Sequence, residues 1–266
     1  HHMEAPPVAP VPAGSDTAIE KIIDIVPEER QKVYNMRHAV EVIADRDSVF
    51  EMKPRYGRSV LTSLARLNGH TVGFLASNPL YKGGAADPDG CCKAASFIVF
   101  CDSFNIPIIM LVDVPGFLIG VDGERKAAPG KIMNWMNALS LATVPKLSVI
   151  LRKSYGQAYI NMAGNKGSDE MALWPTADVG FMDPHTGVNV VFGMKQEDDP
   201  ELFAKRVEEL QRDAAPWELA AMYEAQDVIK PQETRQHLIN MLEVHRLRMT
   251  NGVGEHLMRT WPTSIV

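Results

Sequence analysis

The sequence predicts an α/β fold built on a mostly parallel sheet. Two continuous apolar runs, IPIIMLVDV at 106–114 and VPKLSVILR at 144–152, are typical of strands buried on both faces. Between them, residues 128–143 carry apolar side chains at three- and four-residue spacings, which predicts a helix. Strand–helix–strand units join parallel strands by right-handed crossovers. We therefore expect the two strands to be near neighbours, with the loops 116–124 and 155–158 at one edge.

The strongest local signal in the first half of the chain is Asn68-Gly69, which predicts a two-residue hairpin turn. Residues 56–67 lead into it, and HTVGFLAS at 70–77 is the expected return strand. The Gly/Pro/Asp-rich stretch that follows predicts a loop, and Asp89 or Gly90 is expected to cap a helix. The other expected elements are short helices over 18–26 and within 36–52, a loop over 78–90 and the capped helix over 91–105.

The second half of the chain is expected to continue the alternation of strands and helices. SYG at 154–156 predicts a turn between the second buried strand and the next helix. The remaining expected elements are a helix over 157–165, a short strand over 177–182, helices over 198–227 with a break near Pro216, and a long helix over 232–249.

Composition and charge narrow the class of protein. The chain has 266 residues, 45% of them hydrophobic, enough for one large core. The formal net charge of −6, without a long basic run, argues against nucleic acid as a partner. The apolar runs are far shorter than the roughly 20 residues of a membrane span. Cys91, Cys92 and Cys101 form no CxxC pair, so we expect no metal site, no disulfide framework and a reducing, cytoplasmic setting.

The N-terminal residues are expected to lie outside the folded domain. His1, His2 and Met3 look like the end of a purification tag, and EAPPVAPVPAGS has the composition of an extended linker. We therefore expect a tag remnant and Pro/Ala linker over 1–17 and a single domain over 18–266.

Three loops are candidate sites. At 155–158, a Tyr155-Gly156 turn precedes a helix starting near Gln157, and the first amides of a helix can form an oxyanion hole. The loop after Asp113, with Pro115 and Gly116, lies at the carboxyl end of a strand, where ligands bind in α/β sheets. Adjacent Gly83 and Gly84 could bring backbone amides near a ligand. By spacing alone, an ordinary connecting turn or loop is the favoured interpretation for the first two, and a surface turn is the equal alternative for the third.

The sequence contains no recognisable motif of catalytic side chains. SYGQA is not the GxSxG nucleophile elbow, and no Ser-His-Asp or Cys-His set can be built from the sequence. The loop GFLIGVDG fits neither phosphate-binding glycine pattern.

The sequence resembles the carboxyltransferase β-chain family of acyl-CoA carboxylases, which includes propionyl-CoA carboxylase β and methylmalonyl-CoA carboxyltransferases and decarboxylases. The resemblance runs from about Val26 to the end of the chain. It rests on eight sequence motifs in a fixed order: NG-x-x-VG, KAA-x-F, CD-x-FN-x-P, DVPGF, ATVPK, RK-x-YG-x-AY, WP-TA and DVIKPQETR.

The resemblance implies a crotonase-like α/β fold and a division of labour between two such domains. In the family the N-terminal domain holds the acyl-CoA and the C-terminal domain holds carboxybiotin, and this chain resembles only the C-terminal domain. The implied partners are an acyl-CoA, a biotin carboxyl carrier protein and an N-terminal carboxyltransferase domain or subunit, within a homo- or hetero-oligomer. The implied reaction moves a carboxyl group between carboxybiotin and the α-carbon of a short acyl-CoA.

The resemblance also implies site residues. The family's RK-x-YGGAY matches 152–159, so the turn at Gly156 and the amides of Gln157 and Ala158 would form the oxyanion hole for biotin. Gln157 stands where many members have glycine, and Ile160 stands where an acyl-pocket aspartate is common. The remaining expected contacts are Pro115, Gly116, Phe117, Tyr155 and Tyr159 to the cofactor, and Ile160, Gly83 and Gly84 to the substrate.

Two other functions remain open from the sequence. One is a crotonase-like hydratase, isomerase or decarboxylase that needs no biotin, and the other is a non-catalytic scaffold subunit of a carboxylase complex. Binding of free biotin or of a biotinyl carrier distinguishes the carboxyltransferase hypothesis from both alternatives, because only a biotin-dependent carboxyltransferase is expected to bind them.

Overall fold

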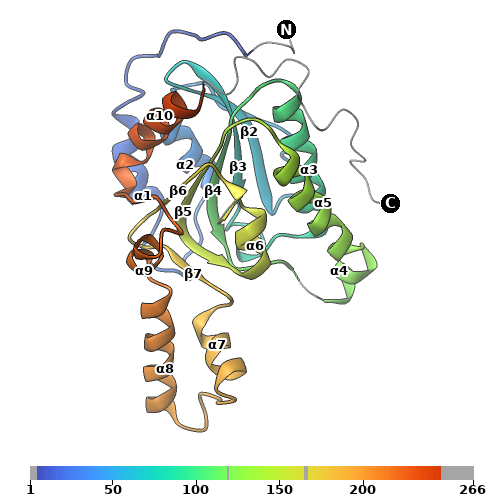
Figure 1. Ribbon diagram of the computed structural model, residues 1–266, viewed down its shortest axis with the longest axis vertical. Helices are drawn as coiled ribbons and strands as arrows, with labels where there is room; N and C mark the ends of the chain where they lie inside the picture. Colours follow the sequence, from blue (N-terminus) through green and yellow to red (C-terminus); the bar gives the residue numbers. More distant parts are fainter. Residues whose placement is uncertain (1–4, 119, 165–166, 247–266) are drawn as a thin grey trace.

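A computed structural model describes residues 5–118, 120–164 and 167–246, and its centre is an eight-stranded sheet (Figure 1). The strand order is β1-β2-β3-β4-β5-β6-β8, with β7 paired to the end of β5. The β1-β2-β3 pairs are antiparallel, and every pair from β3 onward is parallel. The strands are β1 (Phe50–Glu51), β2 (Val60–Leu67), β3 (His70–Ser77), β4 (Ile108–Val114), β5 (Lys146–Tyr155), β6 (Glu170–Leu173), β7 (Asp178–Gly180) and β8 (Asp227–Val228).

Helices cover both faces of the sheet (Figure 1). The α3, α5 and α6 residues share one apolar core with the sheet, and α1, α2 and α10 share the other. The two helices α7 and α8 project from the body as an arm with a small core of its own. The α-helices are α1 (Ile22–Ile25), α2 (Met36–Ile43), α3 (Pro88–Ser103), α4 (Val121–Arg125), α5 (Ala128–Leu141), α6 (Gly156–Asn161), α7 (Pro184–Val191), α8 (Pro200–Asp213), α9 (Pro216–Ala221) and α10 (Thr234–His245), and the 3₁₀ turns are η1 (Ala18–Lys21), η2 (Lys82–Gly84) and η4 (Pro231–Glu233). Among the described residues, no helix combines the length and apolarity that crossing a membrane requires.

The predicted strand neighbours are confirmed. Strands β4 and β5 pair in parallel from Ile108 opposite Lys146 to Val114 opposite Ser154. The α5 helix makes the crossover between them. The loops after both strands therefore leave the same edge of the sheet, as the pattern of alternating elements predicted.

The predicted hairpin is also confirmed. Leu67 pairs with His70, and Asn68 and Gly69 both have positive φ, at 50° and 80°. A two-residue turn with two positive φ angles matches the right-handed twist of its strands, which explains the Asn-Gly sequence.

Two predicted boundaries are wrong, each because of one neighbouring residue. The α3 helix is capped by Asp87, whose carboxylate accepts from Gly90 N at 2.9 Å, because Pro88 already occupies the first helical position. SYG is no turn: β5 runs through Tyr155, and the chain changes direction at Gly156 alone, with φ 58°. Short elements were missed because they carry too little periodicity, namely β6, β8, α4 and α7. The predicted helix over 157–165 is too long, since α6 ends at Asn161, and the last three residues of the predicted helix over 232–249 lie outside the described residues.

The described part of the Pro/Ala segment has no helix or strand, but it contacts the rest of the domain. Ala9 N donates to Gly69 O at 3.0 Å, and the Asp16 carboxylate pairs with Arg235 at 3.0 Å. The segment thus contacts both the hairpin turn and α10. Its contact on α10 is Arg235, a buried residue of the DVIKPQETR motif.

Candidate active site

The three candidate loops meet at the carboxyl edge of the parallel strands. Gly84 packs so closely on the end of β4 that a Cβ there would lie 2.8 Å from Asp113 O. Ala86 N donates to Gly116 O at 3.0 Å, which joins the glycine loop to the loop after β4. Because Val114 lies opposite Ser154, that loop and residues 155–158 leave the sheet side by side. Ligands bind at this edge in open α/β sheets.

The oxyanion turn, residues 155–158, connects β5 to α6. Gly156 has φ 58°, and a Cβ at this position would lie 3.0 Å from Phe181 O, so both the backbone angle and the space favour glycine. Gln157 and Ala158 follow as the second and third residues of α6. Their amides belong to the first turn, where N–H groups have no carbonyl partner inside the helix. The turn can therefore offer two adjacent backbone donors to an oxygen that gains negative charge.

The Gln157 side chain turns along α6. Its amide nitrogen donates to Asn161 Oδ1 at 3.0 Å and lies 3.4 Å from Met136 Sδ on α5. Asn161 is fully buried and donates in turn to Ile132 O at 2.9 Å. The glutamine thus ties α6 to α5 and leaves the donor function of the turn to the backbone.

Several residues predicted to contact a ligand have side chains that bond or pack against other parts of the protein. Tyr155 is 2% exposed and donates to Asp178 Oδ2 at 2.8 Å. The Tyr159 ring packs on Gly164, where a Cβ would lie 2.2 Å from it. Phe117 stacks edge-on against Trp135 at 6.1 Å between ring centroids. Gly84 is buried against β4. For these residues the structure shows packing contacts, and the side chains of Phe117 and Tyr159 remain partly exposed.

The other predicted residues are accessible. Gly83 and Gly116 both have positive φ and open space where a Cβ would stand. Ile160 is 43% exposed on α6, although it is a large apolar residue. Pro115 is half-buried at the end of β4.

A buried ion pair between Arg152 and Asp113 lies near the carboxyl ends of β5 and β4, just before the oxyanion turn. Arg152 and Asp113 are both fully buried, and the Arg152 Nε and Nη2 atoms donate to Asp113 Oδ2 at 2.9 and 2.8 Å. The same guanidinium donates to the carbonyls of Pro27, Glu29 and Lys32 at 2.7–3.0 Å. Asp113 of the DVPGF motif and Arg152 of the RK-x-YG motif therefore join β4, β5 and the segment 27–32.

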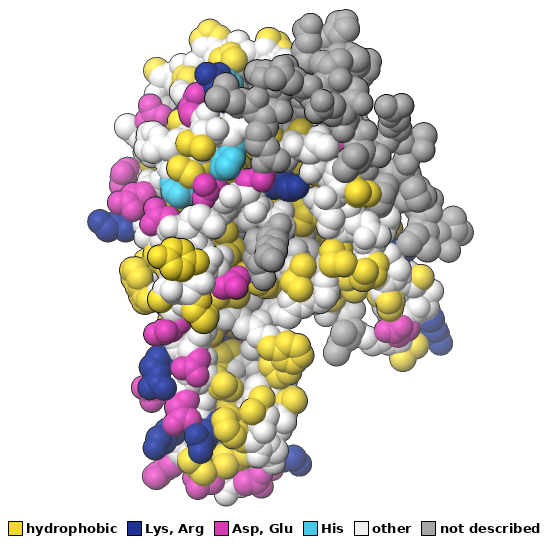
Figure 2. Space-filling view, in the orientation of Figure 1, with side chains coloured by type: hydrophobic (Ala, Val, Ile, Leu, Met, Phe, Trp, Pro, Cys, Tyr) yellow, Lys and Arg dark blue, Asp and Glu magenta, His cyan; other side chains and the backbone are white. Residues whose placement is uncertain are grey.

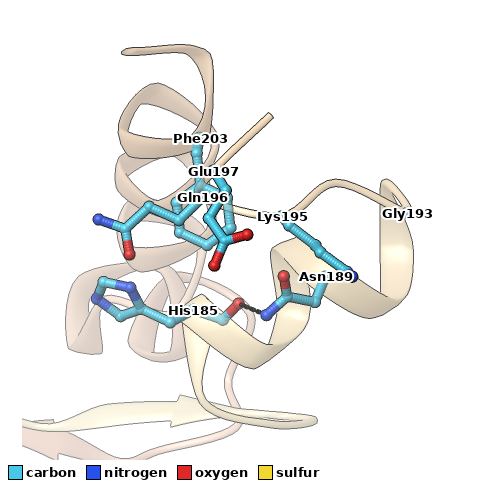
Figure 3. Close-up of a pocket in the computed structure, with 7 residues that line it drawn as sticks. All are labelled: His185, Asn189, Gly193, Lys195, Gln196, Glu197 and Phe203. Atoms are coloured by element: carbon cyan, nitrogen blue, oxygen red, sulfur yellow. Dashed lines mark hydrogen bonds between the residues drawn. The ribbon is translucent and has the colours of Figure 1, made fainter. Parts of the chain in front are cut away.

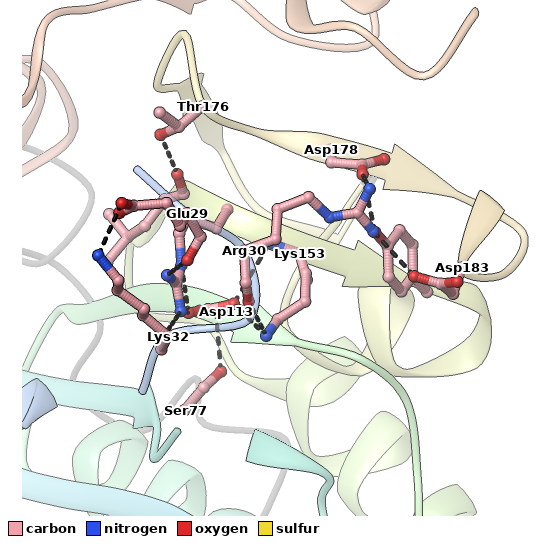
Figure 4. A network of polar contacts seen from close by, with 12 residues as sticks. Glu29, Arg30, Lys32, Ser77, Asp113, Lys153, Thr176, Asp178 and Asp183 are labelled. Carbon is pink, nitrogen blue, oxygen red and sulfur yellow. Dashed lines mark hydrogen bonds and ion pairs between the residues drawn. The ribbon is translucent and has the colours of Figure 1, made fainter. Parts of the chain in front are cut away.

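A second charged group, centred on Arg30, lies next to this ion pair and was not predicted from the sequence. Arg30 bonds the carboxylates of Asp178 and Asp183 at 2.7 and 2.8 Å, and it contacts the Tyr155 hydroxyl (Figure 4). Burial raises the pKa of the Asp178 carboxyl, despite the Arg30 charge. Burial also lowers the pKa of the Lys153 ammonium, which donates to Arg30 O. Asp178 begins β7 and Asp183 caps α7, and these two aspartates on either side of a short strand segment were the signal available in the sequence.

The arm presents apolar surface beside this edge. Figure 2 shows apolar side chains along its α7 side and charged ones along α8. Exposed members on or next to α7 include Phe181 at 83%, Val191 at 66% and Val190 at 63%. Since Phe181 O abuts Gly156, the apolar surface adjoins the oxyanion turn. Exposed apolar surface of this kind is typical of interaction sites.

A hollow of about 790 Å³ opens between the two helices of the arm (Figure 3). His185, Lys195, Glu197 and Phe203 line it, and Asn189 Nδ2 donates to His185 O at 3.0 Å. None of the predicted site residues lies here. No cluster of three or more His, Cys, Asp or Glu that could hold a metal occurs among the described residues.

Comparison with known families gives a match over residues 1–252 to the carboxyl transferase domain. The methylmalonyl-CoA carboxyltransferase 12S subunit of Propionibacterium freudenreichii subsp. shermanii is 38% identical over 88% of this chain and 46% of its own length. The mitochondrial propionyl-CoA carboxylase beta chain of Homo sapiens is 36% identical over 86% of this chain and 42% of its own length. The chain thus spans about half the length of these curated relatives.

Solved structures agree with the fold. The transcarboxylase 12S structure with methylmalonyl-coenzyme A and methylmalonic acid bound, described as a hexamer, superimposes with a TM-score of 0.86 at 36% identity. It covers 92% of this chain, which covers 48% of that one. The beta subunit of geranyl-CoA carboxylase from P. aeruginosa has the same fold, with a TM-score of 0.81 at 22% identity. The expected crotonase-like α/β fold is confirmed.

Proposed function

The chain belongs to the carboxyl transferase domain family, and on this premise we propose that it is the biotin-binding half of a biotin-dependent acyl-CoA carboxyltransferase. The observation that carries the proposal is the oxyanion turn: a glycine with positive φ, followed by two amides at the carboxyl edge of the sheet. The relatives that match over most of this chain carry the names of carboxyltransferases, a carboxylase and decarboxylases, which favours this function over a hydratase or a scaffold.

In the proposed reaction the protein contributes position and charge stabilisation. Carboxybiotin, when bound, supplies the carboxyl group and the base that deprotonates the acyl-CoA. The amides of Gln157 and Ala158 would donate to the ureido oxygen as it gains charge, at a benefit of about 2.7–4 kcal/mol per donor. The turn fits this ligand, since it carries two adjacent backbone donors at the start of α6, and the Arg152–Asp113 pair joins the two strands that lead to this edge. Gly116 and Pro115 would contact the cofactor from the neighbouring loop, and Gly83 would contact the substrate.

Replacing Ala158 with proline tests the amide donors. We expect Ala158→Pro to lower kcat by about 10²–10³-fold, because it removes one N–H from the oxyanion turn. The measurement is carboxyl transfer in the assembled enzyme, together with circular dichroism to verify the fold.

Gln157→Ala is the matched control, since it keeps both amides and removes only the bonds to Asn161 and Met136. It should retain most of the activity. If Gln157→Ala abolished turnover while biotin binding and the fold persisted, the glutamine side chain would be catalytic and the backbone assignment wrong.

Replacing Ile160 tests substrate selectivity. Ile160 is exposed on α6, two residues beyond the proposed donors, so we propose that it faces the acyl group. Ile160→Asp should change the ranking of acetyl-, propionyl- and butyryl-CoA in kcat/KM by ~10–200-fold, the range that pocket contacts give. An unchanged ranking would locate Ile160 away from the acyl pocket.

The proposed partners follow from the same premise. We propose an N-terminal carboxyltransferase domain that holds the acyl-CoA, a biotin carboxyl carrier protein, and a symmetric oligomer in a reducing, cytoplasmic setting. The exposed apolar side chains near the oxyanion turn support assembly, because a partner would remove them from water. A related structure is described as a hexamer.

A further inference from the structure

Lys93 is a buried cation with no anionic partner. It lies on α3 at 2% exposure, and its ammonium donates to Val60 O at 2.9 Å. Among the described residues, no carboxylate reaches ion-pair distance from it, and the nearby Glu51 already accepts two bonds of 2.7 Å from Arg37. An ammonium has three donors, and burying such a charge without a partner is costly. The position therefore has unused capacity for an anion.

A cavity of about 200 Å³ adjoins this ammonium, between α3 and the β1–β2 edge of the sheet. Its lining combines the apolar side chains of Met52, Phe97 and Phe100 with the polar groups of Lys53, Lys93 and Ser96. The Lys53 ammonium lies 3.5 Å from the Ser96 hydroxyl, so a second cation stands at the same cavity. The cavity thus offers two positive charges, a hydroxyl and an apolar wall.

This combination selects a class of ligand. The volume is below the ~300–1,000 Å³ of pockets for drug-sized ligands, so the occupant is small. The apolar wall disfavours inorganic phosphate and sulfate, which have no apolar part. The two ammonium groups disfavour cations and give a neutral alcohol no charge to pair with. A compact apolar anion matches both halves of the lining.

We propose that this cavity binds a short-chain carboxylate, with its carboxylate on Lys93 and Lys53 and its hydrocarbon tail against Met52, Phe97 and Phe100. The site is separate from the oxyanion turn and does not depend on the proposed carboxyl transfer. Ion pairing to a desolvated ammonium contributes to affinity, and contact of the tail with the apolar side chains contributes the rest.

Titration calorimetry of the full chain with sodium hexanoate tests the proposal, with hexanol as the neutral analogue. We expect hexanoate to bind at least tenfold more tightly than hexanol. Lys93→Met should weaken hexanoate at least tenfold and still fold, because methionine is close in size and removes a buried charge. Lys53→Met, at an exposed position, should weaken hexanoate without affecting the fold. Lys205→Met on the arm is the matched control for loss of one positive charge and should bind as the wild type does.

Chemical labelling gives an independent readout. Burial lowers the pKa of the Lys93 ammonium to about 8, despite the opposing charge of Glu51, so acylating reagents should label Lys93 with a midpoint near that pH. Bound hexanoate should slow the labelling of Lys93 and leave that of Lys205 unchanged. The proposal is overturned if the wild type binds no hexanoate, if hexanol binds as tightly, or if Lys93→Met binds hexanoate as the wild type does.

Discussion

The purified chain by itself should give no steady carboxyl transfer from a carboxybiotin donor to acetyl- or propionyl-CoA. The proposed reaction develops negative charge on two oxygens, one on biotin and one on the thioester, and the oxyanion turn is a candidate for the first. The chain spans about half the length of its curated relatives. Without a second domain to hold the acyl-CoA against biotin, the proximity contribution is lost, which can reach ~7–11 kcal/mol. Radioactive carboxyl transfer under steady-state conditions measures this directly.

Addition of a second polypeptide provides the control. An N-terminal carboxyltransferase domain from a relative, mixed with this chain, should restore turnover, whereas the same mixture with the Ala158→Pro chain should not. Sedimentation should show that the two polypeptides associate, because apolar surface near the oxyanion turn becomes buried. Steady turnover by the chain alone would mean that it carries both sites, and the half-enzyme proposal would then be wrong.

Arg152→Met should lower the free energy of unfolding by roughly 3–5 kcal/mol, because it leaves the fully buried Asp113 carboxylate without its partner. The cost should fall at the upper end of this range, since the carbonyls of Pro27, Glu29 and Lys32 also lose their donor. Urea unfolding followed by circular dichroism measures the change, and proteolysis should cut first within 27–32.

Two further variants separate the buried charge from the lost side chain. The double variant Arg152→Met with Asp113→Leu removes both charges and should recover a large part of the stability. Arg206→Met breaks the more exposed pair with Glu209 on α8 and should cost far less stability than Arg152→Met. A cost for Arg152→Met no larger than that for Arg206→Met would show that the buried pair does not hold the edge of the sheet together.

Strong local patterns predicted much of the fold. The Asn68-Gly69 turn requires two positive φ angles, which few residue pairs adopt, so the hairpin follows from two letters of sequence. The continuous apolar runs of β4 and β5 can only be buried on both faces, which predicts parallel neighbours and a common edge for their loops. Elements of two to four residues, such as β6 and β8, contain too little periodicity to be detected in this way.

The sequence by itself determined the α/β class, the hairpin, the common edge of the loops and the glycine of the oxyanion turn, because each depends on local backbone preferences or on burial of a continuous apolar run. Only the tertiary structure decided how the side chains at that edge are used. Tyr155 lies beside Gly156 in the sequence but bonds Asp178, and Arg152 reaches Asp113 and the carbonyls near residue 30. These partners are separated by 23 to 125 residues, and no periodicity relates them. Burial of Lys93 beside an apolar cavity likewise depends on how α3 packs against β2, and the KAA-x-F motif does not specify this packing.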